Sequence, residues 1–271
     1  MIRVGFPFMD RSSAWMGGIN YLRNLIQAIL ADPERVIEPV LIVPVDMPEE
    51  AIAHFGDLDV QVIRCPLLGS RSATAMTGTV LKRLIGRDIV MERWLARNRI
   101  AVLSHLTTLG RRSKIPSIGW IPDFQHLRLP ELFTEAMRRT RDRAFRRIAD
   151  QATVMIVSSN DALGDLKDFM PDAVARTHVL PFVADVSDED VASRAELEQA
   201  FDFTGPYFFI PNQFWPHKNH ALVIESLALM QKTGSAPLVL STGSAKSFHD
   251  PGLYGRLIQR AADLGVASRF R

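Results

Sequence analysis

The chain has 271 residues, a formal net charge of +2 and a hydrophobic fraction of 47%. This length exceeds that of most single domains, so we expect two domains, and the apolar content is sufficient for a buried core. The near-neutral charge argues against a dedicated nucleic-acid binder. A single cysteine, Cys65, excludes an internal disulfide framework and a cysteine-rich zinc site, and it favours a reducing compartment.

The sequence predicts neither a signal peptide nor a membrane-spanning helix. Residues 1–10, MIRVGFPFMD, lack the charged start and the long apolar stretch of a secretion signal. No apolar segment approaches the roughly 20 residues that are needed to cross a bilayer. We therefore expect a cytoplasmic protein, either free or peripheral at the inner face of the membrane.

Short apolar runs alternate with helical patterns through most of the chain. The runs are nearly continuous, as in strands that are covered on both faces, and they lie at residues 2–8, 36–45, 60–65, 100–106, 115–121 and 152–159. Helical patterns are found between several of them, at residues 19–30, 92–100 and 161–170, with Ser159 or Asn160 as the N-cap of the last. This order predicts an α/β fold with a parallel, doubly wound sheet.

An acidic segment, residues 184–206, is poor in large aliphatic side chains and predicts an interdomain linker with a short helix. We expect a Rossmann-like N-terminal domain at 1–183 and a second domain at 207–271. The second domain contains two strand–helix units, with strands at 207–211 and 237–242 and helices at 220–231 and 253–265. Because a two-stranded sheet leaves apolar surface uncovered, we expect this Rossmann-like domain to be incomplete.

The first candidate site follows the first strand, where Gly17 and Gly18 stand at the start of the predicted helix. Glycines let a backbone approach an anion, and the N-terminus of a helix attracts phosphate. The segment fits neither GxGxxG nor a P-loop, which disfavours a nicotinamide dehydrogenase. The residue types leave a phosphate site and a plain helix start as alternatives.

The second candidate site is FFIPNQFWPHKNH at residues 208–220. Lys218 stands where a strand passes into a helix, a place where open α/β sheets bind ligands, and a lysine there can hold a phosphate. Asn212 and Gln213 can add neutral donors. The remaining side chains are interpreted as packing or helix-start residues rather than metal ligands, namely Trp215, His217 and His220.

A third segment, IPDFQH at residues 121–126, places Asp123 and His126 after an apolar strand. These side chains can orient a hydroxyl group or transfer a proton. The alternative, a capping aspartate and a surface histidine, is favoured by the residue types alone.

An arginine-rich helix is predicted at residues 138–147. It presents either a solvated face or a contact with anionic lipid headgroups. Its arginines are Arg138, Arg139, Arg141, Arg143, Arg146 and Arg147.

Several segments, taken in order, resemble group 1 (family 4) retaining glycosyltransferases of the GT-B fold. They are GGINYLRNL (17–25), IPDFQHLRLPELF (121–133), VSSNDALGDL (157–166), HVLPF (178–182) and YFFIPNQFWPHKNH (207–220). The resemblance implies two Rossmann-like domains and sugar transfer from a nucleotide-diphosphate donor to a glycan or lipid-linked acceptor, as in polysaccharide biosynthesis. It implies retention of configuration, with the nucleotide sugar as co-substrate and no cofactor or metal.

The resemblance also implies roles for individual residues. Lys218 matches a lysine that grips the donor diphosphate, whereas Gln213 stands where many members carry an arginine. Gly17 and Gly18 match a glycine loop near the phosphates or the acceptor. Many members carry a histidine before the residue that matches Asp123; this position is Pro122, and His126 is a partial replacement.

Two glutamates, eight positions apart in the family, contact the donor sugar and the ribose beyond the equivalent of Arg271. We therefore expect a C-terminally truncated transferase. The alternative is an inactive remnant, or half of a split transferase, that acts as a binding protein.

Overall fold

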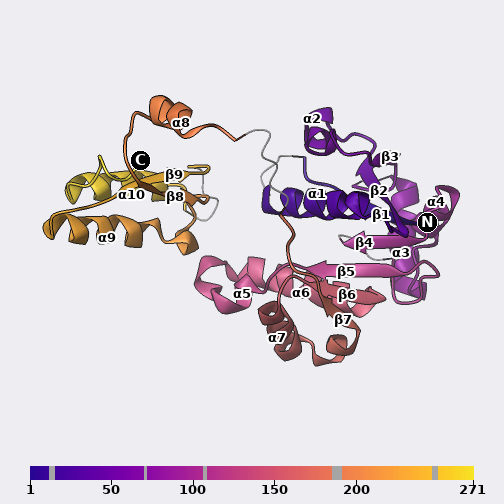
Figure 1. Cartoon of the computed structure of the whole chain (residues 1–271). Helices are drawn as coiled ribbons and strands as arrows, with labels where there is room; N and C mark the ends of the chain where they lie inside the picture. Colours follow the sequence, from indigo (N-terminus) through magenta and orange to yellow (C-terminus); the bar gives the residue numbers. More distant parts are fainter. Residues whose placement is uncertain (12–15, 70–71, 106–108, 185–190, 246–249) are drawn as a thin grey trace. The chain divides into compact units, whose positions relative to one another are not determined.

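The computed structural model describes residues 1–11, 16–69, 72–105, 109–184, 191–245 and 250–271 (Figure 1). Parts of two predicted segments, residue 106 and residues 185–190, lie outside these ranges. The chain divides into two compact units. Unit 1 comprises Met1–Arg128 and Glu135–Val186, and unit 2 comprises Leu129–Thr134 and Ser187–Arg271.

Unit 1 is built on a seven-stranded sheet in the order β3-β2-β1-β4-β5-β6-β7. Every neighbouring pair is parallel, which confirms the predicted α/β class. Strand order reverses between β1 and β4, the kind of position where such sheets bind ligands. The strands are β1 (Ile2–Pro7), β2 (Ile37–Pro44), β3 (Gln61–Cys65), β4 (Val102–His105), β5 (Ser117–Ile121), β6 (Val154–Val157) and β7 (Thr177–Val179).

The helices of unit 1 are α1 (Met16–Ala31), α2 (Glu49–Ile52), α3 (Ala73–Ile85), α4 (Ile89–Arg97), α5 (Gln125–Arg128), α6 (Glu135–Gln151) and α7 (Asn160–Phe169), with 3₁₀ turns at Ala53–Phe55 and Pro171–Arg176. Ser159 is the N-cap of α7, as predicted, and its hydroxyl accepts the Ala162 N–H at 3.0 Å. The helix predicted from residue 92 begins three residues earlier because the Asp88 carboxylate accepts the Met91 N–H at 3.0 Å and caps it.

The core of unit 1 explains why its strands are almost continuously apolar. Ile19 and Ile26 of α1 pack with Leu41 in one cluster, whereas the neighbouring β2 residue Ile42 belongs to another cluster with Leu95 of α4. Alternate residues of β2 thus enter different cores, so the strand is covered on both faces. A further cluster joins β5 and β6 to α6 and α7.

Helix α3 was not predicted, because its apolar pattern does not mark a buried face. Gly78 is its only buried residue in the described part of the chain, while Met76, Val80 and Leu84 are exposed. The prediction of an amphipathic helix assumes that its apolar residues face the core. Here that assumption fails, although Ser72 at the N-cap and Gly86 at the C-cap are local signals of a helix.

Unit 2 contains a sheet of two parallel strands, β8 (Tyr207–Pro211) and β9 (Leu238–Thr242), as predicted for its described residues. Its helices are α8 (Arg194–Phe201), α9 (His220–Lys232) and α10 (Leu253–Asp263), with 3₁₀ turns at Pro130–Leu132 and Pro216–Lys218. Residues 269–271 run parallel to β9: the Val239 N–H donates to the Arg269 carbonyl at 2.8 Å, and the Ser241 N–H to the Arg271 carbonyl at 2.7 Å.

Gly119 of β5 supplies a stability test. A Cβ at this position would lie 2.6 Å from Cγ2 of Ile148 and 2.8 Å from Sδ of Met155. We predict that Gly119→Ala lowers the free energy of unfolding of unit 1 by about 1–3 kcal/mol, the usual effect of overpacking. The measurement is urea denaturation followed by circular dichroism. Gly164→Ala is the matched control, since nothing lies within 4 Å of a Cβ there. Its stability should stay unchanged or rise, and equal destabilisation of both variants would contradict the packing argument.

Candidate functional site

The connection between β8 and α9 holds the polar residues that the sequence singles out in unit 2. A 3₁₀ turn, Pro216–Lys218, places Lys218 on the surface directly before α9. Asn219 then adopts a left-handed conformation, with φ of 52°, and its side chain caps the helix by accepting the Leu222 N–H at 3.4 Å. The lysine ammonium therefore lies beside the N-terminus of a 13-residue helix, where backbone N–H groups favour an anion.

Gln213 ties this connection to the loop that follows β9. Its Oε1 accepts the Ser244 N–H at 3.0 Å, and the Phe214 N–H donates to the Ser244 carbonyl at 3.3 Å. Gly243 makes the close approach possible, because its φ is 148° and a Cβ would collide with the Asn212 carbonyl. The carboxyl ends of both strands thus form one assembled surface. The Gln213 side chain has a structural function in it that the sequence did not reveal.

His220, the first residue of α9, is buried with 2% of its surface exposed. Its ring stacks on Phe214, with 4.5 Å between ring centroids. Neither ring nitrogen has a hydrogen-bond partner among the described residues, although buried polar groups are normally paired. Burial lowers the His220 pKa, and the Lys218 charge lowers it further, so the ring is neutral. The sequence predicted only a helix-start residue at this position. Because its ring nitrogens have no partner among the described residues, His220 is a candidate ligand contact.

The glycine pair of unit 1 lies inside the first turn of α1, which begins at Met16. Gly17 is exposed and nothing lies within 4 Å of a Cβ there, so space does not require a glycine. Gly18 is buried and lines a cavity of about 190 Å³. The other lining residues are Phe8, Met9, Asp10, Tyr21, Leu22, His105 and Trp120.

This cavity lies at the carboxyl ends of β1, β4 and β5, and its aromatic wall was not predicted from the sequence. Tyr21 stacks on Trp120 with ring centroids 4.3 Å apart, and the Trp120 Nε1–H donates to the Ser158 hydroxyl at 3.1 Å. The Tyr21 hydroxyl lies 2.9 Å from Nε2 of His105. A signal was present, since polar side chains at the carboxyl ends of apolar runs mark the ligand edge of a parallel sheet.

His105 is buried in an uncommon conformation, with φ of 79°. Both ring nitrogens are engaged, since Nδ1 lies 2.6 Å from the Ser104 hydroxyl and Nε2 contacts Tyr21. Burial lowers the pKa of His105 to about 4 and raises the pKa of Tyr21. Both groups are therefore neutral at physiological pH.

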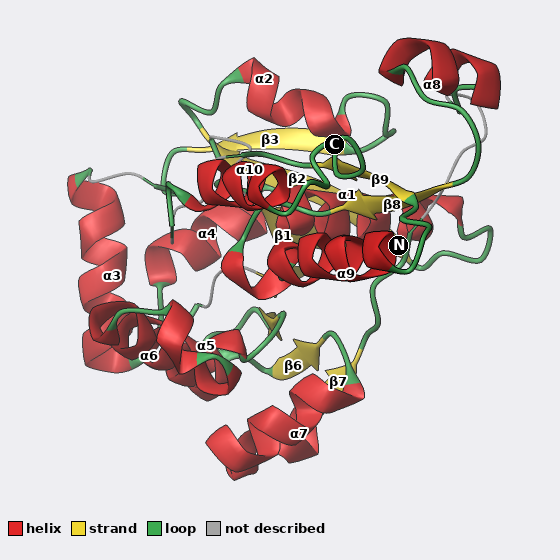
Figure 2. Ribbon diagram, turned by 90° about the vertical axis from the view of Figure 1, so that its left-hand side faces the viewer, coloured by secondary structure: helices red, strands yellow, loops and turns green. Residues whose placement is uncertain are grey.

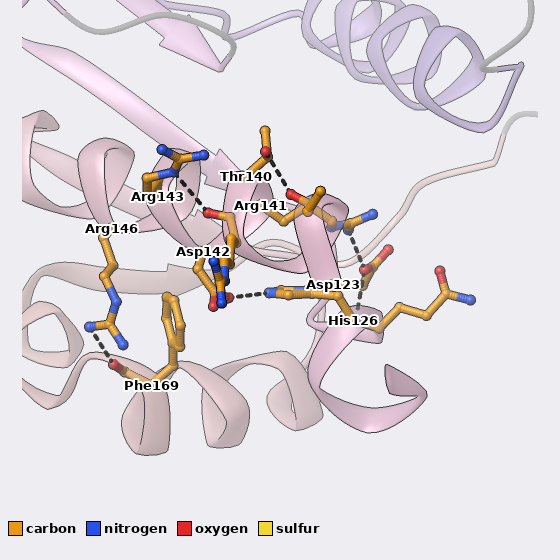
Figure 3. A network of polar contacts seen from close by, with 11 residues as sticks. Asp123, His126, Thr140, Arg141, Asp142, Arg143, Arg146 and Phe169 are labelled. Carbon is orange, nitrogen blue, oxygen red and sulfur yellow. Dashed lines mark hydrogen bonds and ion pairs between the residues drawn. The ribbon is translucent and has the colours of Figure 1, made fainter. Parts of the chain in front are cut away.

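Asp123 and His126 each contact a side chain of helix α6, Arg141 and Asp142 respectively (Figure 3). The Asp123 carboxylate accepts the Gln125 N–H and a hydrogen bond from Arg141, both at 3.0 Å. His126 Nε2 lies 2.9 Å from Oδ1 of Asp142. The Asp123 side chain is 52% exposed, whereas that of His126 is 0% exposed.

The alternative that His126 is a surface residue is therefore wrong. Its ring packs edge-on against Phe145 and beside Phe124. Burial lowers the His126 pKa, and the Asp142 hydrogen bond offsets part of this effect. The capping interpretation of Asp123 is confirmed by its bond to the Gln125 N–H.

The arginine-rich helix α6 uses several of its cations within the protein (Figure 3). Arg139 pairs with Glu135, and Arg141 pairs with Asp123. The Arg146 guanidinium lies over the Phe169 ring, 4.2 Å from its centroid, and Arg143 donates to the Arg139 carbonyl at 3.1 Å. Part of the predicted charged face is thus occupied by internal contacts.

The described residues contain no group of three or more histidine, cysteine, aspartate or glutamate side chains arranged to hold a metal ion. They also contain no helix with the length and apolarity required to cross a bilayer.

Comparison with known proteins identifies the fold. No family model and no curated protein sequence matches the chain, but solved structures do. A glycosyltransferase from Rickettsia africae matches with a TM-score of 0.61 at 11% identity, over 100% of this chain and 67% of that one. Sucrose-phosphate synthase from Thermosynechococcus elongatus matches with a TM-score of 0.58 at 11% identity, over 100% and 70%.

A third match is UDP-GlcNAc 2-epimerase from Neisseria meningitidis bound to UDP-GlcNAc, with a TM-score of 0.53 at 11% identity, over 100% of this chain and 71% of that one. At such identities the likeness concerns the fold. The chain therefore has the GT-B fold, and it spans about two thirds of the length of these proteins.

His105 supplies a test by pH. Because its pKa is lowered to about 4 in the folded protein, the unfolded chain binds a proton that the folded chain does not between about pH 6.5 and about pH 4. Stability must fall as the pH falls through this range. We predict that unit 1 loses about 2 kcal/mol of unfolding free energy between about pH 7 and about pH 5 through this residue.

His105→Asn removes the titrating group, and asparagine tolerates the left-handed conformation. The pH dependence of urea denaturation should therefore become shallower in this variant. His178→Asn, at an exposed histidine of β7, is the control and should keep the original slope. Identical slopes in all three proteins would show that His105 does not resist protonation in the fold.

Proposed function

We propose that this protein is a glycosyltransferase that takes a sugar from a nucleotide-diphosphate donor. The observation that carries the proposal is the surface at the carboxyl ends of β8 and β9, where an exposed Lys218 and a buried, unsatisfied His220 stand at the N-terminus of α9. The fold supports it, because the structural neighbours include glycosyltransferases and a protein bound to UDP-GlcNAc.

The donor diphosphate is proposed to bind between Lys218 and the first turn of α9. The lysine supplies a positive charge, and the turn supplies backbone N–H groups. A His220 ring N–H can donate to a phosphate oxygen, which would satisfy one buried nitrogen. The Gln213 Nε2 and the Asn212 side chain can add neutral donors, while the Gln213 Oε1 continues to hold the Ser244 N–H.

Acceptor recognition is proposed for unit 1, at the cavity lined by Tyr21, His105 and Trp120. The stacked aromatic pair offers an apolar surface, and the Asp10 carboxylate lines the same cavity. Gly17 and Gly18 are proposed to let a phosphate or an acceptor approach the start of α1. The acceptor itself is proposed to be a glycan or a lipid-linked glycan, and transfer is proposed to retain the configuration of the donor sugar.

Asp123 and His126 take different parts in this proposal. Asp123 is half-exposed and paired with Arg141, so its carboxylate oxygens can accept a hydrogen bond from a sugar hydroxyl. His126 is buried against Asp142, which favours a positioning role for it: it anchors α5 to α6. The predicted participation of His126 in proton transfer stays a prediction. The Arg138–Arg147 segment also stays a proposed contact with the membrane, at its cytoplasmic face.

A second candidate function is a binding protein, either an inactive remnant or one half of a split transferase. The observation that favours it is the β8–β9 sheet, whose Phe208 and Phe209 are 64% and 55% exposed. Release of nucleoside diphosphate from a panel of nucleotide sugars distinguishes the two functions, because only a transferase consumes the donor.

Lys218 supplies the first test of the donor site. Lys218→Ala should weaken nucleoside diphosphate binding by about 1.5–3 kcal/mol, the range for a hydrogen bond to a charged group. The measurement is calorimetric titration with uridine, guanosine and adenosine diphosphates. Lys232→Ala, at the opposite end of α9, is the control and should bind as tightly as the wild type. Unchanged affinity in Lys218→Ala would mean that the cluster is only a helix start.

His220 supplies a second, independent test. His220→Phe keeps the stack on Phe214 and removes two buried nitrogens that have no partner among the residues that the structure describes. We predict a weaker diphosphate affinity, by about 1 kcal/mol, with an unfolding free energy that is unchanged or higher. A purely structural histidine would give a loss of stability with no change in affinity, which urea denaturation and calorimetry on the same variant would reveal.

A further inference from the structure

Helix α3 carries an exposed apolar stripe, formed by Met76, Val80 and Leu84. These residues are 60%, 52% and 76% exposed, and their spacing of four places them on one side of the helix. The opposite side faces the protein, because a Cβ at Gly78 would collide with the Asp88 carboxylate that caps α4. The stripe is therefore held outward by the packing of α3 on α4.

The charged residues of α3 itself are cationic, while the Asp88 carboxylate lies against the inner side of the helix. The helix contains Lys82 and Arg83 and no acidic residue. Arg112 reaches its C-terminal end, since a Cβ at Gly86 would lie 3.4 Å from Cγ of Arg112. Burial lowers the Lys82 pKa, the Asp88 charge opposes this effect, and the charge of Arg147 of α6 adds to it. Figure 2 shows α3 and α6 beside each other. Arg83 and Arg112 are both exposed.

We propose that the α3 stripe docks on a lipid bilayer, with Arg83 and Arg112 against anionic headgroups. An apolar row flanked by cations is the composition of helices that lie in the membrane interface. The apolar side chains would leave water for the acyl boundary, and each cation would gain energy from the negative surface potential. A bilayer also explains why an exposed helix keeps large apolar residues at successive turns.

This surface differs from the charged face of α6, where Arg139, Arg141 and Arg146 are engaged by neighbouring groups. The α3 stripe presents a continuous row of apolar side chains, which the charged face of α6 does not. The proposal is independent of sugar transfer, because it rests only on α3 and the residues that border it.

The test is sedimentation of the full chain with vesicles of phosphatidylcholine alone and of phosphatidylcholine mixed with phosphatidylglycerol. The wild type should sediment mainly with the anionic vesicles, and more weakly at high salt. Substituting Met76, Val80 and Leu84 together by serine should abolish most of the binding at every salt concentration. Arg83→Gln and Arg112→Gln should each weaken binding to anionic vesicles about fivefold at low salt.

Matched controls lie on unit 2. Serine at the exposed apolar residues Leu222, Leu229 and Met230 of α9, and Lys232→Gln with Arg269→Gln, should leave vesicle binding unchanged. Circular dichroism verifies that each variant is folded. Failure of the folded wild type to bind, or undiminished binding by the triple serine variant, would overturn the proposal. So would a wild-type dimer in gel filtration that the triple variant loses, since the stripe would then meet a second copy.

Discussion

Parallel strand pairing is the constraint on which the rest of unit 1 depends. A parallel strand cannot return through a tight turn, so each connection must cross a face of the sheet, and both faces become covered. Residues of β2 accordingly alternate between two separate cores. The same constraint brings all the strand carboxyl ends to one edge, where His105, Trp120 and the start of α1 enclose a cavity. Polar side chains gather at this edge because the faces of the sheet are covered by helices.

Three histidines are equally buried, and the hydrogen-bond partners of their rings separate structural from functional roles. His126 and His105 are both held by polar partners, Asp142 for the first and Tyr21 with Ser104 for the second. Burial lowers the His220 pKa as well, but its ring nitrogens have no partner in the described part of the chain. A buried polar group without a hydrogen-bond partner lowers the free energy of unfolding. This cost is the reason to place a ligand at His220 rather than at the other two.

Periodicity was sufficient to predict most strands, because doubly covered strands are continuous apolar runs. The α9 helix and the N-cap at Ser159 were also predictable from local chemistry. Helix α3 was not, since its apolar side faces outward. The aromatic cavity was missed for another reason: Tyr21, His105 and Trp120 are far apart in the sequence, and only strand order makes them neighbours. Pairwise contacts such as His126 with Asp142 are equally invisible in one sequence.

Gln213 illustrates how a contact within the protein limits what a ligand site can use. An arginine at this position would add a cation for a diphosphate, but it has no acceptor for the Ser244 N–H, which the Gln213 Oε1 now receives. The close approach of Gly243 to the Asn212 carbonyl leaves little room to rearrange this loop. The chain therefore joins the loops after β8 and β9 with a neutral amide. In the proposed donor site, neutralisation of the diphosphate depends on the Lys218 ammonium and on the dipole of α9. These two features lie side by side because Asn219 turns the chain sharply between them.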